Sequence, residues 1–240
     1  MPPEGTPEVD AGHLPTDERD YLARLVNQLE AALGDDLVAV WLFGSAAYGG
    51  YEQGRSDLDV QAAVRRRLAE VQLDSMVAAV VGGSSAMPAP AIELVVHLQA
   101  NLVGPELPVP WLLNLECGPA RPLHDGRDHR SEPPHWFVLD LAMGRDHGRT
   151  LYGPRPADVI GPVPREAQVE AIVQSIEWHE HLEPGHPDRL ANAARGLRYI
   201  RTGTWGSKPA GLVWLAEAYC DRAVTEAEIA EQVRAELDRS

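Results

Sequence analysis

The sequence predicts an α+β protein, in which a small mixed β-sheet with flanking helices is followed by an all-α helical-bundle domain. Helical and extended hydrophobic patterns alternate from residue 17 to residue 98. The stretch Gly-Pro-Val-Pro at 161–164 then indicates a linker, and the patterns beyond it have the helical period. We therefore expect a flexible tail over 1–15, a first domain over 16–160 and a helical domain over 165–240.

Each element of the first domain follows from its hydrophobic pattern. A helix is expected from Asp17, because apolar residues recur there at i, i+3, i+4 and i+7, and Gly34 is placed to end it. These apolar residues are Leu22, Leu25, Val26 and Leu29. Strands are expected over Val38–Phe43, Leu58–Val64 and Ala91–Leu98, which are short apolar runs.

The stretch Pro105–Pro134 is expected to be irregular, and it contains the sequence LHDGRDHR. This cluster suggests a metal site, but turn residues separate His124 from His129, and neither a helical nor a strand spacing relates them. A solvated loop is therefore the preferred interpretation. A helical pattern resumes over Phe137–Gly148.

About four helices are expected in the second domain. The first covers Arg165–Leu182, the second runs from a cap at Asp188 to Gly203, and the third from Ser207 to Cys220. The fourth begins with a capping box formed by Thr225 and Glu228.

Trp178 lies off the apolar stripe of the first of these helices. At 100° per residue it is about 180° away from Val169, which belongs to that stripe. Such a tryptophan either packs against the other domain or is exposed to a ligand, and the sequence favours neither interpretation.

Residues 44–59 carry the strongest chemical signal and read GSAAYGGYEQGRSDLD. Asp57 and Asp59 are one residue apart at the start of an expected strand, so both point to the same face and can share magnesium. Gly44 has no Cβ, so the Gly44-Ser45 turn lets backbone N–H groups approach a phosphate, and Ser56 directly precedes the aspartates. The alternative is a β-hairpin with an acidic rim. The combination predicts nucleotide transfer.

Lys208 lies in the first turn of an expected helix, where the helix dipole favours anions by about 0.3–1 kcal/mol. An anion between the lysine and the helix N-terminus would remove this conflict, which suggests a phosphate site. An exposed lysine tolerated at that cost is an equally good interpretation.

Composition limits the functional classes. The chain has 240 residues, 44% of them hydrophobic, and a formal net charge of −15. This charge argues against a duplex nucleic-acid partner and suits a cationic small molecule better. Cys117 and Cys220 have no metal-binding or disulfide spacing, so ordinary thiols are expected. The sequence contains neither an apolar run long enough for a bilayer nor a secretory signal, so we expect a cytoplasmic protein with no membrane contact. It also contains no heptad pattern, and we expect a monomer.

Four segments together resemble one family. In order, they are LFGSAAYGGYEQGRSDLDV, AIELVVH, FVLDLAMGRDHGRTLYGP and NAARGLRYIRTGTWGSKPAGLVWLAE, and they span roughly residues 20–220. The first has the motif order of the nucleotidyltransferase superfamily that includes DNA polymerase β. All four resemble the aminoglycoside (3'')(9) adenylyltransferases, which modify streptomycin and spectinomycin. The resemblance implies an N-terminal nucleotidyltransferase domain.

The resemblance also implies roles for single residues. Ser45 would lie against the nucleotide phosphates, Asp57 and Asp59 would bind Mg²⁺, and Lys208 would reach the triphosphate of ATP. Glu93 would be the general base that accepts a proton from the acceptor hydroxyl. Glu93 is alternatively a third metal ligand or a strand residue that faces solvent.

For the acceptor, the resemblance implies that Trp178 helps to bind streptomycin and that Glu183 and Asp188 contact the drug. We expect the site to lie between the two domains and to close on binding. The implied activity is magnesium-dependent transfer of AMP from ATP to an aminoglycoside hydroxyl, which confers antibiotic resistance. The alternatives are a nucleotidyltransferase that acts on a protein or RNA end, and a non-catalytic nucleotide-binding sensor.

Overall fold

The computed structural model describes residues 10–105, 107–220 and 223–237. Over these residues the chain forms two compact units. The first unit runs to Glu132 and resumes over Gly144–Pro162, and the second comprises Pro133–Met143 and the chain from Val163 onward. The first contains a mixed β-sheet with helices, whereas every element described wholly within the second is a helix. The predicted α+β fold class is therefore confirmed.

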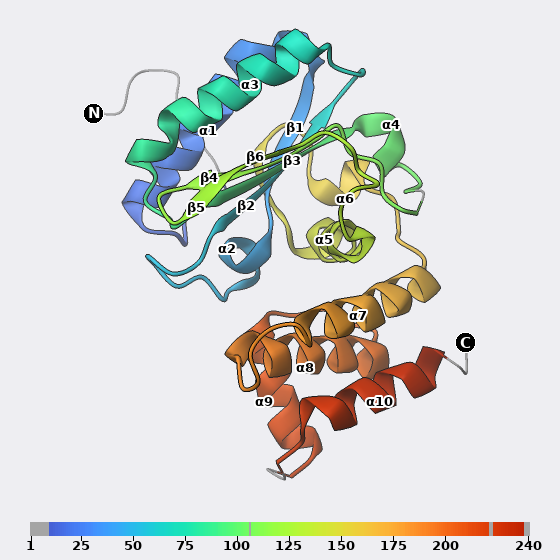
Figure 1. Cartoon of the computed structure of the whole chain (residues 1–240). Helices are drawn as coiled ribbons and strands as arrows, with labels where there is room; N and C mark the ends of the chain where they lie inside the picture. Colours follow the sequence, from blue (N-terminus) through green and yellow to red (C-terminus); the bar gives the residue numbers. More distant parts are fainter. Residues whose placement is uncertain (1–9, 106, 221–222, 238–240) are drawn as a thin grey trace. The chain divides into compact units, whose positions relative to one another are not determined.

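The elements of the first unit can be followed along the chain in Figure 1. Its helices are α1 (Thr16–Leu33), α2 (Gly44–Tyr48), α3 (Glu70–Gly83), α4 (Gln99–Leu102) and α6 (Pro156–Val159). Its strands are β1 (Leu37–Leu42), β2 (Leu58–Val64), β3 (Ile92–Leu98), β4 (Leu113–Gly118), β5 (Arg121–Gly126) and β6 (Arg149–Tyr152). Short 3₁₀ turns span Gly34–Asp36 and Ser84–Ala86. Helix α5 (Pro134–His147) begins in the second unit and ends in the first.

The strands form one sheet in the order β5-β4-β3-β2-β1-β6. Strands β2 and β3 are parallel, and α3 provides the crossover that a parallel pair requires. The other neighbouring strands are antiparallel. The two strands that carry the predicted acidic residues therefore start at the same end of the sheet.

One face of the sheet is covered by α1 and α3 (Figure 1). The predicted stripe of α1 is buried there against alternate residues of the strands, among them Val60, Leu94 and Leu115. The buried stripe consists of Leu22, Leu25, Val26 and Leu29. Burial of this apolar surface is the main driving force for this layer.

On the other face, Phe43 fixes the end of β1. The C-terminal end of α5 approaches its ring through two glycines: a Cβ on Gly144 would lie 2.1 Å from Phe43 Cε2, and one on Gly148 would lie 2.6 Å from Cε1. Only glycine permits such close approach of the helix backbone. The Phe43 N–H also donates to the Asp59 carbonyl oxygen at 2.8 Å. Gly44 is thereby held beside the start of β2.

The stretch that we expected to be irregular contains the hairpin of β4 and β5, so this prediction was wrong. In β4 the apolar Leu113, Leu115 and Cys117 are buried and alternate with Asn114 and Glu116, which is the period of a strand. Strand β5 is exposed over most of its length, so it has no apolar pattern to reveal it.

Two local predictions also differ from the structure. The Gly-Ser turn is the first turn of the short helix α2, with Gly44 at a φ of +57°. The expected tail lies partly outside the described residues. From Asp10 onward the chain is packed: Ala11 and Leu14 are buried, and the Asp10 N–H donates to the Thr150 carbonyl oxygen at 3.0 Å.

The second unit contains α7 (Arg165–His179), α8 (Pro187–Thr202), α9 (Lys208–Ala218) and α10 (Glu226–Leu237) in addition to the start of α5. The predicted capping box of α10 is confirmed, since the Thr225 N–H donates to Glu228 Oε2 at 2.7 Å and the Glu228 N–H to Thr225 Oγ1 at 3.3 Å. The cap of α8 is His186 and not Asp188, because His186 Nδ1 accepts from the Asp188 N–H.

Among the helices of the described residues, none combines the length and the apolar character needed to cross a membrane.

Candidate active site

Three carboxylates lie side by side across the centre of the sheet. Asp59 of β2 is the register partner of Glu93 of β3, and Glu93 is the partner of Glu116 of β4. Directly opposed residues on neighbouring strands project from the same face. Each is partly exposed, although the residues that flank it along its strand are buried. We refer to Asp59, Glu93 and Glu116 as the acidic row.

Gly44 provides the space that the Asp59 carboxylate occupies. A Cβ at position 44 would lie 1.6 Å from Asp59 Oδ2 and 2.4 Å from its Cγ. The positive φ of Gly44 also places the backbone where L-residues are disfavoured. The Gly-Ser motif and the second aspartate are therefore in direct contact.

Asp57 lies just before β2 and interacts with a cation from the hairpin. Arg121 Nη2 is 3.7 Å from Asp57 Oδ2, and Arg121 Nε is 3.5 Å from Glu116 Oε1. Burial raises the pKa of Asp57 above its ordinary value, although the Arg121 charge and a hydrogen bond from the Ala91 backbone act in the opposite direction. Arg121 thus connects Asp57 to the acidic row.

The segment between the two halves of the motif is held by its own hydrogen bonds. Ser56 Oγ accepts from the Glu52 N–H at 3.0 Å, and the Ser56 N–H donates to the Glu52 carbonyl oxygen at 2.9 Å. Tyr51 donates its hydroxyl to Oε1 of the buried Glu18 at 3.0 Å. Ser45 accepts backbone hydrogen bonds from the following turn through its carbonyl oxygen.

The donor chemistry of this site fits magnesium. Asp57, Asp59 and Glu93 provide carboxylate oxygens, which are the ligands that Mg²⁺ prefers. Within the described ranges, no group of three or more His, Cys, Asp or Glu side chains is arranged to hold a metal alone. Mg²⁺ commonly binds through one or two carboxylates and substrate phosphates, without an all-protein cage.

In the second unit, the structure brings Lys208 and Asp188 together. Lys208 Nζ donates to Asp188 Oδ1 at 2.7 Å. Burial raises the pKa of Asp188, but the hydrogen bond and charge of Lys208 outweigh it, so the pKa of Asp188 lies below its usual value. We had expected these residues to contact different ligands, the phosphates and the acceptor.

Trp178 packs within the second unit against the start of α5. Its ring is edge-on to that of Trp136, with centroids 4.9 Å apart, and 5.1 Å from the imidazole of His179. Trp178 remains 38% exposed, so it retains a surface that a ligand can contact. Glu183 is exposed in the connection between α7 and α8.

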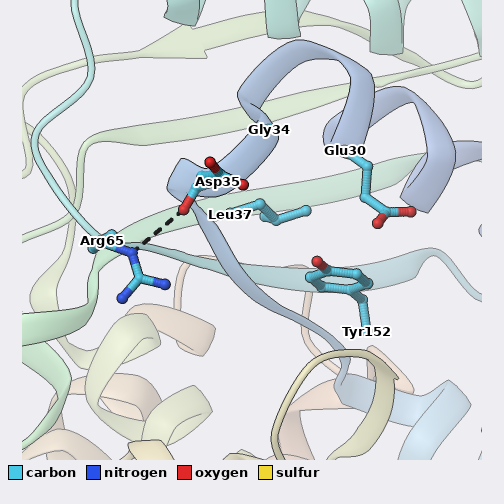
Figure 2. Close-up of a pocket in the computed structure, with 6 residues that line it drawn as sticks. All are labelled: Glu30, Gly34, Asp35, Leu37, Arg65 and Tyr152. Carbon is cyan, nitrogen blue, oxygen red and sulfur yellow. Dashed lines mark hydrogen bonds between the residues drawn. The ribbon is translucent and has the colours of Figure 1, made fainter.

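A pocket of about 420 Å³ lies elsewhere in the first unit (Figure 2). Its lining residues are Glu30, Gly34, Asp35, Leu37, Arg65 and Tyr152. Leu37 pairs with Val64, which places this pocket at the end of β1 and β2 opposite to Phe43 and Asp59. None of the residues predicted for the site lines it.

Sequence reasoning missed Glu116 and Arg121, because both lie in the stretch that we expected to be irregular. The alternation of apolar and polar residues over 113–117 was the signal that could have identified β4 and placed Glu116 on a sheet face. No comparable signal exists for Arg121, whose position depends on the pairing of an exposed strand.

No family model matches this chain. Aminoglycoside (3'')(9) adenylyltransferases from Klebsiella pneumoniae, Shigella flexneri and Escherichia coli are each 27% identical to it over 220 residues. The alignments cover 85% of this chain and 77%, 77% and 76% of the respective relatives.

Among solved structures, the chain is similar to the spectinomycin adenyltransferase AAD(9) from Enterococcus faecialis, which was crystallised with ATP and spectinomycin. The TM-score is 0.63 at 16% sequence identity, and the match covers 92% of this chain and 88% of the other. At this identity the similarity establishes the fold. The predicted α+β fold class agrees with this similarity.

Proposed function

We propose that this chain, a homologue of the aminoglycoside (3'')(9) adenylyltransferases, transfers AMP from ATP to a hydroxyl of an aminoglycoside of the streptomycin or spectinomycin type. Pyrophosphate is released, and modification of the drug confers resistance. The observation that carries this proposal is the acidic row beside Gly44, found in a chain whose sequence relatives are adenylyltransferases. We further propose that the enzyme acts in the cytoplasm, where ATP is available, and that it acts as a monomer.

Asp57 and Asp59 are the residues that we assign to Mg²⁺, and a third metal ligand remains the alternative role of Glu93. Bound magnesium would neutralise phosphate charge and favour departure of pyrophosphate. The protein contributes positioning: Gly44 leaves room for the Asp59 carboxylate, and the sheet fixes Asp59 next to Glu93. Positioning and charge stabilisation dominate catalysis of this reaction class.

Glu93 is the general base in this proposal. Its carboxylate would accept the proton from the acceptor hydroxyl as that oxygen attacks the α-phosphorus. Its position in the middle of the acidic row supports the role, because one neighbour is the metal-binding Asp59 and the other is Glu116. The base is thus fixed by two strands beside the metal ligands.

Gly44, Ser45 and Ser56 would contact the nucleotide, and Lys208 would contact its phosphates. Lys208 lies at the start of α9 and is ion-paired with Asp188. The Asp188 carboxylate therefore balances the charge of its ammonium when ATP is absent. For the acceptor we assign Trp178, Glu183 and Asp188. The exposed part of the Trp178 ring supports this assignment, as does the lowered pKa of Asp188, which favours its charged form.

The proposal is tested by measuring pyrophosphate release with ATP and Mg²⁺ across streptomycin, spectinomycin, kanamycin and gentamicin. Release is expected with streptomycin or spectinomycin, and it should be lost in Asp57→Asn. Release from none of the four would contradict the proposal. ATP binding without any release would instead favour a sensor, and transfer to protein or RNA would favour the other alternative substrate class.

A further inference from the structure

Arg121 occupies an unusual position for a cation, between a proposed metal ligand and a carboxylate of the acidic row. It lies 3.7 Å from Asp57 and 3.5 Å from Glu116. Both separations exceed the 2.7–3.2 Å typical of N–H···O hydrogen bonds. Charge attraction therefore holds Arg121 near both partners, without the directional bonds that would fix its guanidinium on one of them.

Arg127, six residues further along the chain, is an arginine whose guanidinium is fixed by hydrogen bonds. It donates to Asp125 at 2.9 Å, to Glu70 at 2.6 Å and to Asp74 at 2.8 Å. Its side chain is 29% exposed, whereas that of Arg121 is 53% exposed. Arg121 is thus the looser of the two, although both lie close to several carboxylates.

A cation that binds Asp57 must compete with this arginine, because two positive charges cannot share one carboxylate without repulsion. We propose that Arg121 is a positioning residue which pairs with Asp57 before the metal binds, yields Asp57 to the metal and is then retained by Glu116. This inference deepens the proposed function and rests on it, since it takes Asp57 as a metal ligand.

Glu116 has a specific part in this exchange. It is the register partner of Glu93, and its carboxylate is the second partner of Arg121. Its charge can therefore hold the guanidinium when the metal takes Asp57. When Glu116 is present, Arg121 can release Asp57 and still have a carboxylate partner. When Glu116 is removed, Asp57 is the one of these two partners that Arg121 keeps, so the arginine competes more strongly with the metal.

The experiment titrates the full chain with MnCl₂ without nucleotide and follows free Mn²⁺ by electron paramagnetic resonance. Arg121→Gln should bind Mn²⁺ about two- to fivefold more tightly than the native chain, which is the effect of a partly exposed ion pair. Arg66→Gln is the matched control. It removes the same charge from a 60% exposed arginine that pairs with Asp36, so it corrects for net charge.

Glu116→Gln should weaken Mn²⁺ binding in the native chain but have a much smaller effect in the Arg121→Gln background. A double-mutant cycle measures this difference. A carboxylate that merely attracts the metal would have the same effect in both backgrounds, and that result would overturn the inference.

Equal Mn²⁺ binding by Arg121→Gln and Arg66→Gln would also overturn it. If Asp57→Asn does not change Mn²⁺ binding, both the inference and the proposed metal site are wrong. If the Mn²⁺ results are as expected but no aminoglycoside is adenylylated, the proposed activity alone fails.

Discussion

At position 44, backbone conformation and the neighbouring Asp59 carboxylate impose the same requirement. The residue has a φ of +57°, and the space where a side chain would begin is filled by the Asp59 carboxylate. Gly49, at the end of the same short helix, also has a positive φ of +81°, yet nothing lies within 4 Å of its Cβ position. Substitution of Gly49 therefore tests backbone strain alone, whereas substitution of Gly44 tests backbone strain together with the contact to Asp59.

Gly44→Ala should reduce transfer by about a hundredfold or more, because displacement of a catalytic group by about 1 Å has effects of this size. Gly49→Ala should retain most of the activity. Gly49→Ala should lose roughly 1–2 kcal/mol of unfolding free energy through the left-handed backbone conformation. Gly44→Ala should lose more, because its Cβ would also meet the Asp59 carboxylate. Initial rates and urea unfolding test these expectations, and equal loss of activity in both variants would argue against a role for the Gly44–Asp59 contact.

His97 is a buried residue of the sheet that links folding to pH. It is 1% exposed, its Nε2 lies 2.7 Å from Gln61 Oε1, and burial lowers its pKa to about 4. The ordinary pKa of histidine is about 6.5. Between these values the unfolded chain binds the proton more readily than the folded chain, so stability is greatest above pH 6.5 and falls as the pH decreases toward 4.

This contribution of His97 amounts to at most about 3 kcal/mol of unfolding free energy. His97→Gln should therefore unfold with a weaker pH dependence over this range than the native chain, and the exposed His181→Gln should resemble the native chain. Thermal unfolding at intervals from pH 4 to pH 7 provides the comparison. An unchanged slope in His97→Gln would show that another group carries the dependence.

At the scale of elements, the ends of the helices are determined by local hydrogen bonds. The capping box of α10 satisfies N–H groups that the helix itself leaves unpaired. Thr225→Ala should cost about 1 kcal/mol of unfolding free energy. Glu231→Ala, at an exposed position in the same helix, is the control and should cost less. Urea unfolding with equal losses in both variants would contradict the cap assignment.

The elements that could be predicted are those whose hydrophobic period is complete. Helix α1 has a buried stripe, and β2 is apolar apart from Asp59 and Gln61, so both were recognised with nearly the observed bounds. Strand β5 is exposed and α2 has only five residues, so neither has enough periodic positions to be recognised. Pairing with β4 creates β5, and it also places Arg121 at the site.

At the scale of the whole molecule, the formal net charge of −15 affects how an acceptor arrives. A negative surface attracts a polycationic aminoglycoside, and salt screens this attraction over about 10 Å at 0.1 M. The KM for streptomycin should therefore rise with NaCl concentration more steeply than the KM for ATP. Steady-state kinetics at several salt concentrations measure both, and a KM for streptomycin independent of salt would show that this charge does not assist binding.

AMP transfer directed by Asp57 and Asp59 is the central proposal. The direct measurement is mass spectrometry of streptomycin and spectinomycin after incubation with the full chain, ATP and Mg²⁺, beside an Asp59→Asn variant of native stability. We predict that the native chain adds one adenylyl group to at least one of these drugs and that Asp59→Asn adds none. Unmodified drugs with the native chain, or equal modification by Asp59→Asn, would contradict the account.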